Sequence, residues 1–214
     1  VDIADKIVHT GDTNTAIRFP AADTFTVETG GTERLRVNSN GVVLVGHDTP
    51  LTTEGIFQSQ LVGTDFATSG SSQFRFQDGV SGPTVALAHS RNGTKGSHTI
   101  LANDDEFGKI RFYGSDGSDF GQFGAEIRAI VNGTPAAGTD MPGALIFGTT
   151  ADGASTSTER MRIDSSGRLL VGATSSSYAY SSVVIEGNAT FTAGTGTLQL
   201  QLGGANPNSQ GSGL

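Results

Sequence analysis

A segment of fifteen residues occurs twice in the chain, and this internal repeat constrains the fold more than any other feature. Residues 32–46 have the sequence TERLRVNSNGVVLVG, and residues 158–172 have the sequence TERMRIDSSGRLLVG. Most positions are identical, and several differences are conservative, such as Val37 for Ile163 and Asn38 for Asp164. An ungapped match of this length indicates one structural unit that the chain uses at two places.

Each copy has the pattern of a β-hairpin. Residues 33–37 alternate between polar and apolar, which places the apolar side chains on one face of a strand and the two arginines on the other. A turn follows, with Gly41 or Gly167 where a left-handed residue is favoured. Beyond the glycine, a near-continuous apolar run is typical of a strand buried on both faces. Because an isolated hairpin is marginal in water, we expect each copy to pack against the same hairpin of another chain.

The composition favours short strands over one thick core. Among 214 residues there are 31 glycines, and only 35% of residues are hydrophobic and 16% charged. Glycine supplies the positive φ that tight turns need and destabilises helices. Twelve phenylalanines and a modest charge argue against disorder. We therefore expect an all-β chain that completes its core with neighbouring subunits.

Charge and residue usage exclude several functional classes. A net charge of −8 argues against nucleic acid as a partner, because binding it needs a basic surface. Cysteine is absent, which excludes disulfides and thiol nucleophiles. No apolar run approaches the roughly 20 residues that span a bilayer, and the residues from Val1 do not resemble a signal peptide. We expect no membrane insertion and no cofactor.

Further strands are predicted outside the repeats. They lie at residues 6–9, 16–19, 25–29, 73–76, 84–89, 97–101, 109–113, 125–131, 145–149, 183–186 and 197–202. Regular spacing with glycine turns predicts a wider, β-sandwich-like domain in the middle of the chain. The expected division is an N-terminal β-unit with the first repeat (1–50), the middle domain (51–157), the second repeat with its following strands (158–202) and a linker-like tail (203–214).

The repeat resembles one found in a known family. Residues 158–167, TERMRIDSSG, are similar to the shaft repeat of bacteriophage tail fibres, especially those of marine phages and cyanophages, and residues 3–20, 88–96 and 111–117 resemble the same proteins. The resemblance implies an elongated homotrimer in the virion, assembled in the host cytoplasm, that contacts other tail proteins and a host receptor or glycan. Full-length relatives often end in a self-cleaving chaperone domain, whose serine–lysine dyad has no counterpart here.

The repeat residues allow two interpretations. Each copy carries two arginines beside a glutamate, Glu33 with Arg34 and Arg36, and Glu159 with Arg160 and Arg162. The arginines could form a row that binds host carbohydrate or lipopolysaccharide phosphate. Alternatively, they pair with the glutamates while their aliphatic stems cover the edge of the core. Repetition along a shaft favours this second, structural interpretation.

Other candidate sites carry weaker signals. The four histidines, His9, His47, His89 and His98, lack metal-ligand spacing, so only a cluster on a trimer axis could bind a metal. Residues 103–106 and 114–119 offer carboxylates but not the spacing of a calcium loop, which favours solvated turns. The aromatic residues of the middle block are expected in a core. Tyr178 and Tyr180 alternate in a serine-rich stretch and are candidates for surface contact.

The sequence thus predicts a structural protein and not an enzyme. We expect a segment of a trimeric tail fibre that acts as a stiff spacer in host-cell attachment. The alternative is that residues 51–157 form a lectin-like module that recognises a host surface glycan. A capsule depolymerase would need two converging carboxylates, and no local pattern indicates such a pair.

Overall fold

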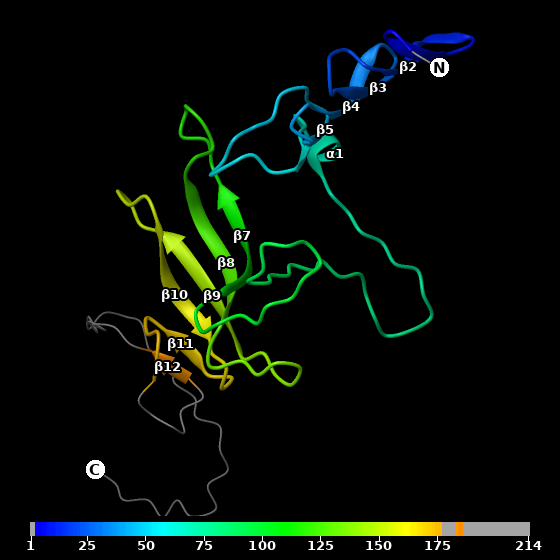
Figure 1. The fold of residues 1–214 in the computed structure, drawn as a ribbon. Coiled ribbons are helices and arrows are strands. Elements are labelled where there is room, and N and C mark those ends of the chain that lie inside the picture. Colours follow the sequence, from blue (N-terminus) through cyan, green and yellow to red (C-terminus); the bar gives the residue numbers. More distant parts are fainter. Residues whose placement is uncertain (1–2, 177–182, 186–214) are drawn as a thin grey trace, which may run out of the picture.

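Two six-stranded β-sheets follow one another along the molecule (Figure 1). The structure is a computed structural model, and it describes residues 3–176 and 183–185. Only four residues of this part, in α1 (Phe66–Ser69), are helical, and none of its helices is long and apolar enough to cross a membrane. The prediction of an all-β fold is confirmed.

The first sheet is a meander in the order β1-β2-β3-β4-β5-β6. Its strands are β1 (Lys6–His9), β2 (Asp12–Arg18), β3 (Phe25–Thr29), β4 (Thr32–Val37), β5 (Val43–Val45) and β6 (Ser59–Leu61). Neighbouring strands are antiparallel from β1 to β5, whereas β6 runs parallel to β5. The first repeat forms β4, the turn and β5, as the predicted hairpin requires.

The second sheet has the same plan in the order β7-β8-β9-β10-β11-β12. Its strands are β7 (Glu106–Tyr113), β8 (Phe123–Val131), β9 (Gly143–Thr150), β10 (Ser157–Ile163), β11 (Leu169–Val171) and β12 (Val183–Ile185). Again the last strand alone is parallel to its neighbour. The structural repeat is therefore a whole sheet, larger than the fifteen residues that match in sequence.

The same hydrogen bonds shape the turn in both copies. In the first, Asn38 Oδ1 accepts the backbone N–H groups of Asn40 and Val42, each at 3.0 Å. In the second, Asp164 Oδ1 accepts those of Ser166 at 3.0 Å and Arg168 at 2.9 Å. The next glycines, Gly41 and Gly167, have φ values of 75° and 76°, in the left-handed region that other residues avoid. An Asx side chain and a glycine at fixed spacing thus close each hairpin.

Three predicted strands are absent from the described structure. Residues 73–76, 84–89 and 97–101 alternate as strands do, but they form no regular secondary structure. Residues 84–89 pass beside β7, where Leu87 lies over Gly108, but none of the three segments pairs with a strand of the described structure. Residues 70–89 are all exposed. The predicted strand at 197–202 and the tail at 203–214 lie outside the described residues.

The middle of the chain is shared between the sheets and forms no separate sandwich. β6 belongs to the first sheet, and β7 to β9 share the second sheet with β10. Extensive contacts occur only between strands of one sheet, so the two described sheets do not pack face to face within one chain. The domain boundaries at residues 50 and 157 stay a prediction.

Candidate interface on the two sheets

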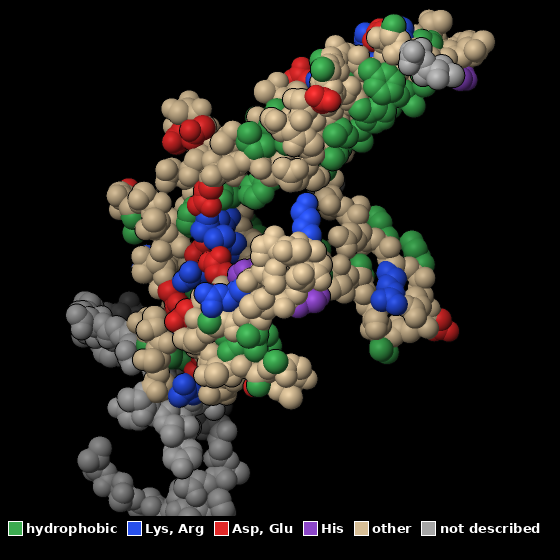
Figure 2. Space-filling model, viewed as in Figure 1, with side chains coloured by type: hydrophobic (Ala, Val, Ile, Leu, Met, Phe, Trp, Pro, Cys, Tyr) green, Lys and Arg blue, Asp and Glu red, His purple; other side chains and the backbone are tan. Residues whose placement is uncertain are grey.

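One face of the first sheet is an unbroken apolar surface, which we call the apolar face of that sheet. Cross-strand pairing joins one residue from each strand into a row, Ile7, Ile17, Val27, Leu35, Val45 and Leu61. A second row pairs Phe25 with Val37 and Val37 with Val43. Ile7 is 50% exposed and Leu61 43% exposed. Figure 2 shows hydrophobic side chains gathered along this sheet at the top of the view.

The second sheet has an equivalent apolar face. Its first row joins Ile110, Ile127, Phe147, Met161 and Val171, and its second joins Ala129, Leu145, Ile163, Leu169 and Val183. At its open edge, Ile110 and Phe112 are 54% and 55% exposed. Apolar side chains exposed together in this way are typical of an interaction surface.

The opposite face of each sheet carries ion pairs over a few buried aliphatic residues. Leu44 and Leu170, both 0% exposed, are the cross-strand partners of Arg36 and Arg162 on this face. Arginine stems can cover apolar side chains while the guanidinium stays polar. In Figure 2, acidic and basic side chains alternate over the second sheet. Each sheet therefore has one charged face and one apolar face.

A β-bulge brings the glutamate and arginine of each repeat together. On β4, Arg34 is the extra residue, because Leu35 pairs with Val27 and Glu33 with Glu28. The parity of the strand changes there, so Glu33 lies on the same face as Arg36. The Arg36 Nε–Glu33 Oε1 distance is 2.7 Å. In a regular strand, residues three apart lie on opposite faces, but the bulge allows Glu33 and Arg36 to contact each other.

The second copy repeats this geometry and is more buried. Arg160 is the bulge residue of β10, and the Arg162 Nε–Glu159 Oε1 distance is 2.5 Å. The hydrogen bond with Glu159 raises the pKa of Arg162 above its ordinary value. Each bulge arginine donates from Nε to a threonine near the end of the preceding strand, Arg34 to Thr29 at 3.0 Å and Arg160 to Thr149 at 2.9 Å. All four repeat arginines therefore have partners within the sheet.

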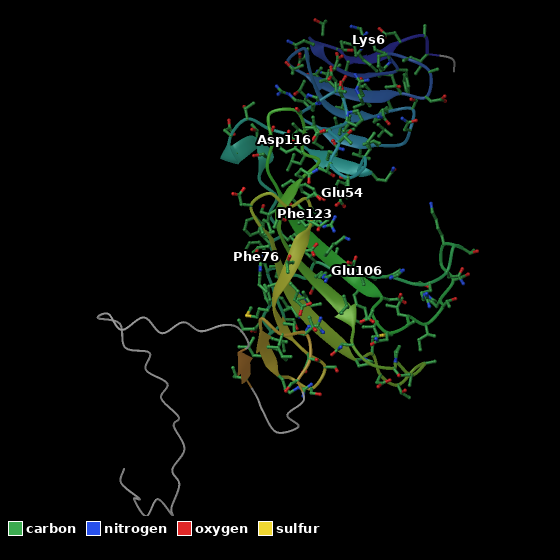
Figure 3. The ribbon with its side chains drawn as sticks, turned by 90° about the vertical axis from the view of Figure 1, so that its left-hand side faces the viewer. Lys6, Glu54, Phe76, Glu106, Asp116 and Phe123 are labelled. Carbon is green, nitrogen blue, oxygen red and sulfur yellow. The ribbon has the colours of Figure 1, made fainter. Side chains whose placement is uncertain are left out.

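A second buried charge lies at the start of the second sheet. Glu126 is 4% exposed and accepts from Ser157 Oγ at 2.7 Å and Arg111 Nε at 3.0 Å. Burial alone would raise the pKa of Glu126, but these hydrogen bonds outweigh it and hold the pKa below its ordinary value. Arg111 also pairs with Glu54, which lies between the two sheets (Figure 3). No pattern in the sequence marked this network.

The other candidate residues are dispersed. His89 Nδ1 lies 2.7 Å from the Glu106 carbonyl oxygen, and His47 Nδ1 contacts Thr49. Within the described residues, no three His, Asp or Glu side chains converge as a metal site. Asp116 Oδ1 accepts two backbone N–H groups of its own turn, which lowers the pKa of Asp116. Tyr178 and Tyr180 lie outside the described residues.

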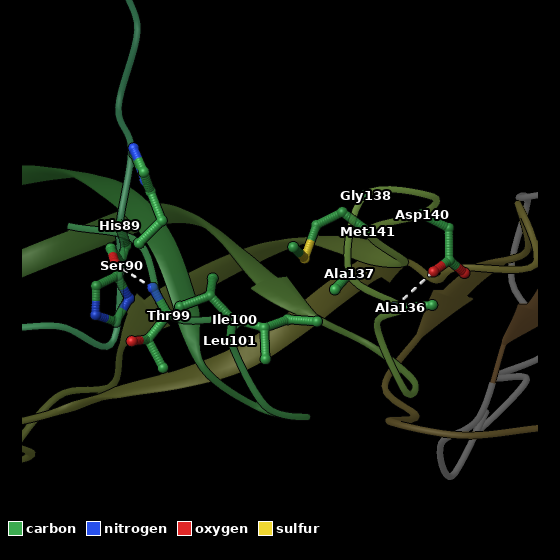
Figure 4. Close-up of a pocket in the computed structure, with 11 residues that line it drawn as sticks. His89, Ser90, Thr99, Ile100, Leu101, Ala136, Ala137, Gly138, Asp140 and Met141 are labelled. Carbon is green, nitrogen blue, oxygen red and sulfur yellow. Dashed lines mark hydrogen bonds between the residues drawn. The ribbon is translucent and has the colours of Figure 1, made fainter. Parts of the chain in front are cut away.

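A cavity of about 360 Å³ opens beside the second sheet (Figure 4). Two loops enclose it, residues 89–101 on one side and residues 136–141 on the other. Ile100, Leu101 and Met141 supply apolar surface, and His98 and Asp140 add polar groups. Its size and mixed lining suit a small polar ligand with an apolar side.

Comparison with solved structures identifies the fold as that of a bacteriophage tail-fibre domain. In particular, the chain is similar to the carboxy-terminal domain of the bacteriophage T5 L-shaped tail fibre, with a TM-score of 0.56 and 14% identity over 88% of this chain and 83% of that one. The same domain with its intramolecular chaperone domain gives 0.56 and 14%, over 95% of this chain and 60% of that one. No protein-family model and no curated protein matches the chain.

Proposed function

We propose that the chain is a structural segment of a homotrimeric tail fibre of the marine phage or cyanophage type, and that it acts as a stiff spacer in host-cell attachment without catalysing a reaction. The observation that carries this proposal is the unbroken apolar row across all six strands of the first sheet. The fold shared with a T5 tail-fibre domain supports it.

The two faces of each sheet suit a three-fold assembly. A single-layered sheet cannot bury its own apolar face, and burial contributes about 25 cal/mol per Å². Three copies with the apolar faces of their first sheets turned inward would form a closed core there and leave the ion pairs of those sheets in water. Such a rod would project from the virion, with other tail proteins at one end and a host receptor or glycan at the other, and would be assembled in the host cytoplasm.

Native mass spectrometry tests the trimer directly. The expected mass is about 66 kDa, three times the 21.9 kDa of one chain. Val45→Lys places a charge on the apolar face at a position 38% exposed in the single chain, so the monomer should tolerate it whereas the trimer should not. We expect at least tenfold weaker association. Asn40→Lys, in the exposed hairpin turn, is the control and should stay trimeric. A wild-type protein of 21.9 kDa at micromolar concentration contradicts the proposal.

The cavity supports a second candidate function, recognition of a host glycan. An aliphatic floor with histidine and carboxylate groups can contact a sugar ring and its hydroxyls. A glycan array probed with the whole protein tests this function, and Met141→Trp, which fills the cavity, should abolish any binding. A pure spacer binds no glycan in either form.

A further inference from the structure

Residues 70–86 form an arm that projects from the second sheet without packing on the rest of the described chain. Every residue of the arm is exposed, with Phe76 at 96% and Val80 at 107%. Its described side-chain hydrogen bonding consists of Arg75 Nη1 donating to the Gly82 carbonyl oxygen at 3.3 Å, within the arm itself. Figure 1 shows the arm reaching away from β7. Fixing such a segment costs conformational entropy, and the described part of the chain offers no contact that offsets this cost.

The pattern of the arm is that of a strand with one apolar side. Phe74 and Phe76 alternate with Gln73, Arg75 and Gln77. In an extended conformation, the two phenylalanines point to one side and the polar residues to the other. The phenylalanine side of the arm therefore suits contact with an uncharged, apolar surface. The polar side of the arm would then face water.

The C-terminal end of the arm leads directly onto the apolar face of its own second sheet. Leu87 lies over Gly108 of β7, where a Cβ atom would be 2.7 Å from the Leu87 Cβ. Gly108 shares this face with Ile110 and Phe112. From Leu87 to Val80 the extended chain spans about 23 Å, whereas packed sheets lie about 10 Å apart. The tip of the arm can thus reach the sheet of an adjacent copy.

We propose that the arm of each chain lies on the apolar face of the second sheet of the next chain in the trimer. Phe74 and Phe76 would cover the exposed residues there, Ile110, Phe112, Leu145 and Ile163. This inference rests on the proposed homotrimer. Each chain donates one arm and accepts one, so a cyclic exchange leaves no arm and no second sheet uncovered.

Paired cysteines test the exchange, because the chain has no cysteine of its own. Phe76→Cys is combined in turn with Ile110→Cys, Leu145→Cys and Ile163→Cys, and the whole protein is oxidised and analysed by non-reducing electrophoresis and native mass spectrometry. We expect covalent trimers from at least one pair. The matched control is Phe76→Cys with Lys109→Cys, since Lys109 precedes Ile110 on β7 and faces the opposite side. It should give no covalent trimer.

The two measurements separate the possible failures. A native trimer whose cysteine pairs give only intrachain disulfides, or none, overturns the exchange and leaves the tail-fibre trimer standing. A native monomer overturns both. A third possibility, covalent trimers from the Lys109 control as readily as from the apolar-face pairs, would place the arm elsewhere and also overturn the exchange.

Discussion

Glu159 and Arg162 form an ion pair on one side of strand β10 although three residues of spacing would normally set them on opposite sides. The bulge at Arg160 makes this contact possible, and the bulge at Arg34 does the same for Glu33 and Arg36. The conserved spacing of these residues in the two copies thus encodes a break in strand alternation as well as a pair of charges.

We expect Glu159→Ala to destabilise the protein by about 1–3 kcal/mol, because Arg162, 10% exposed at its side chain, loses the acceptor of two charged hydrogen bonds. Glu33→Ala is the matched control. Its pair with Arg36 is about 22–23% exposed, so the loss should be smaller. Thermal unfolding by calorimetry measures both. Equal losses in the two copies would show that burial of the pair does not matter.

Asp164→Asn should make the second turn resemble the first, where Asn38 accepts the equivalent backbone hydrogen bonds. The amide keeps the Oδ1 acceptor but loses the charge that pairs with Arg168 Nε at 2.7 Å. Burial alone would raise the pKa of Asp164, but the hydrogen bonds from Arg168 and Ser166 outweigh it and hold the pKa below its ordinary value of 3.8. We expect a loss of about 1 kcal/mol at neutral pH.

The sign of this pH dependence follows from the lowered pKa. The stabilisation by Asp164 is complete above its unfolded pKa and is lost as the pH falls through the lower folded pKa. Unfolding free energies of the wild type and Asp164→Asn should therefore differ at neutral pH and converge in strong acid. A difference that grows below pH 3.8 would contradict this assignment.

Gly167→Ala should cost about 1–2 kcal/mol, because φ is +76° there and a Cβ atom disfavours that region. Nothing lies within 4 Å of the added methyl group, so the cost is conformational and not steric. Gly55→Ala is the control, since it also faces open space but lacks a positive φ. Chemical denaturation should show the first variant destabilised and the second close to the wild type.

Gly108→Ala should displace Leu87, since the new Cβ would lie 2.7 Å from the Leu87 Cβ. We expect a loss of about 1–3 kcal/mol and faster amide exchange at residues 85–89. Leu87→Gly removes the clashing atom, so the double variant should lose less than the sum of the two single changes. Strictly additive losses would mean that the two residues do not touch.

The sequence predicted the parts of the fold that depend on local pattern. Alternation located β1 and β3 at their observed bounds, and Gly41 and Gly167 marked the hairpin turns. It failed at residues 73–76, 84–89 and 97–101, where the alternation is strand-like but no strand of the described structure forms a ladder with them. A ladder needs a partner as well as a propensity.

The apolar faces could be expected only in outline. The sequence indicated a shared interior, but the rows depend on register across six strands, which no local pattern specifies. The bulges were not predicted either, because simple alternation places Arg34 and Arg36 on one face. The threonines that accept from the bulge arginines, Thr29 and Thr149, are a usable signal, since each lies within the last two residues of the strand that precedes a repeat.

Because the topology is duplicated, the molecule can become longer without needing a new fold. Because β1 to β6 and β7 to β12 follow one plan, each sheet can be specified by its own strands, turns and bulges. A longer protein of this kind needs further copies of the same sheet and no new architecture. Reach toward a distant surface could then evolve by tandem gain or loss of sequence, one sheet at a time.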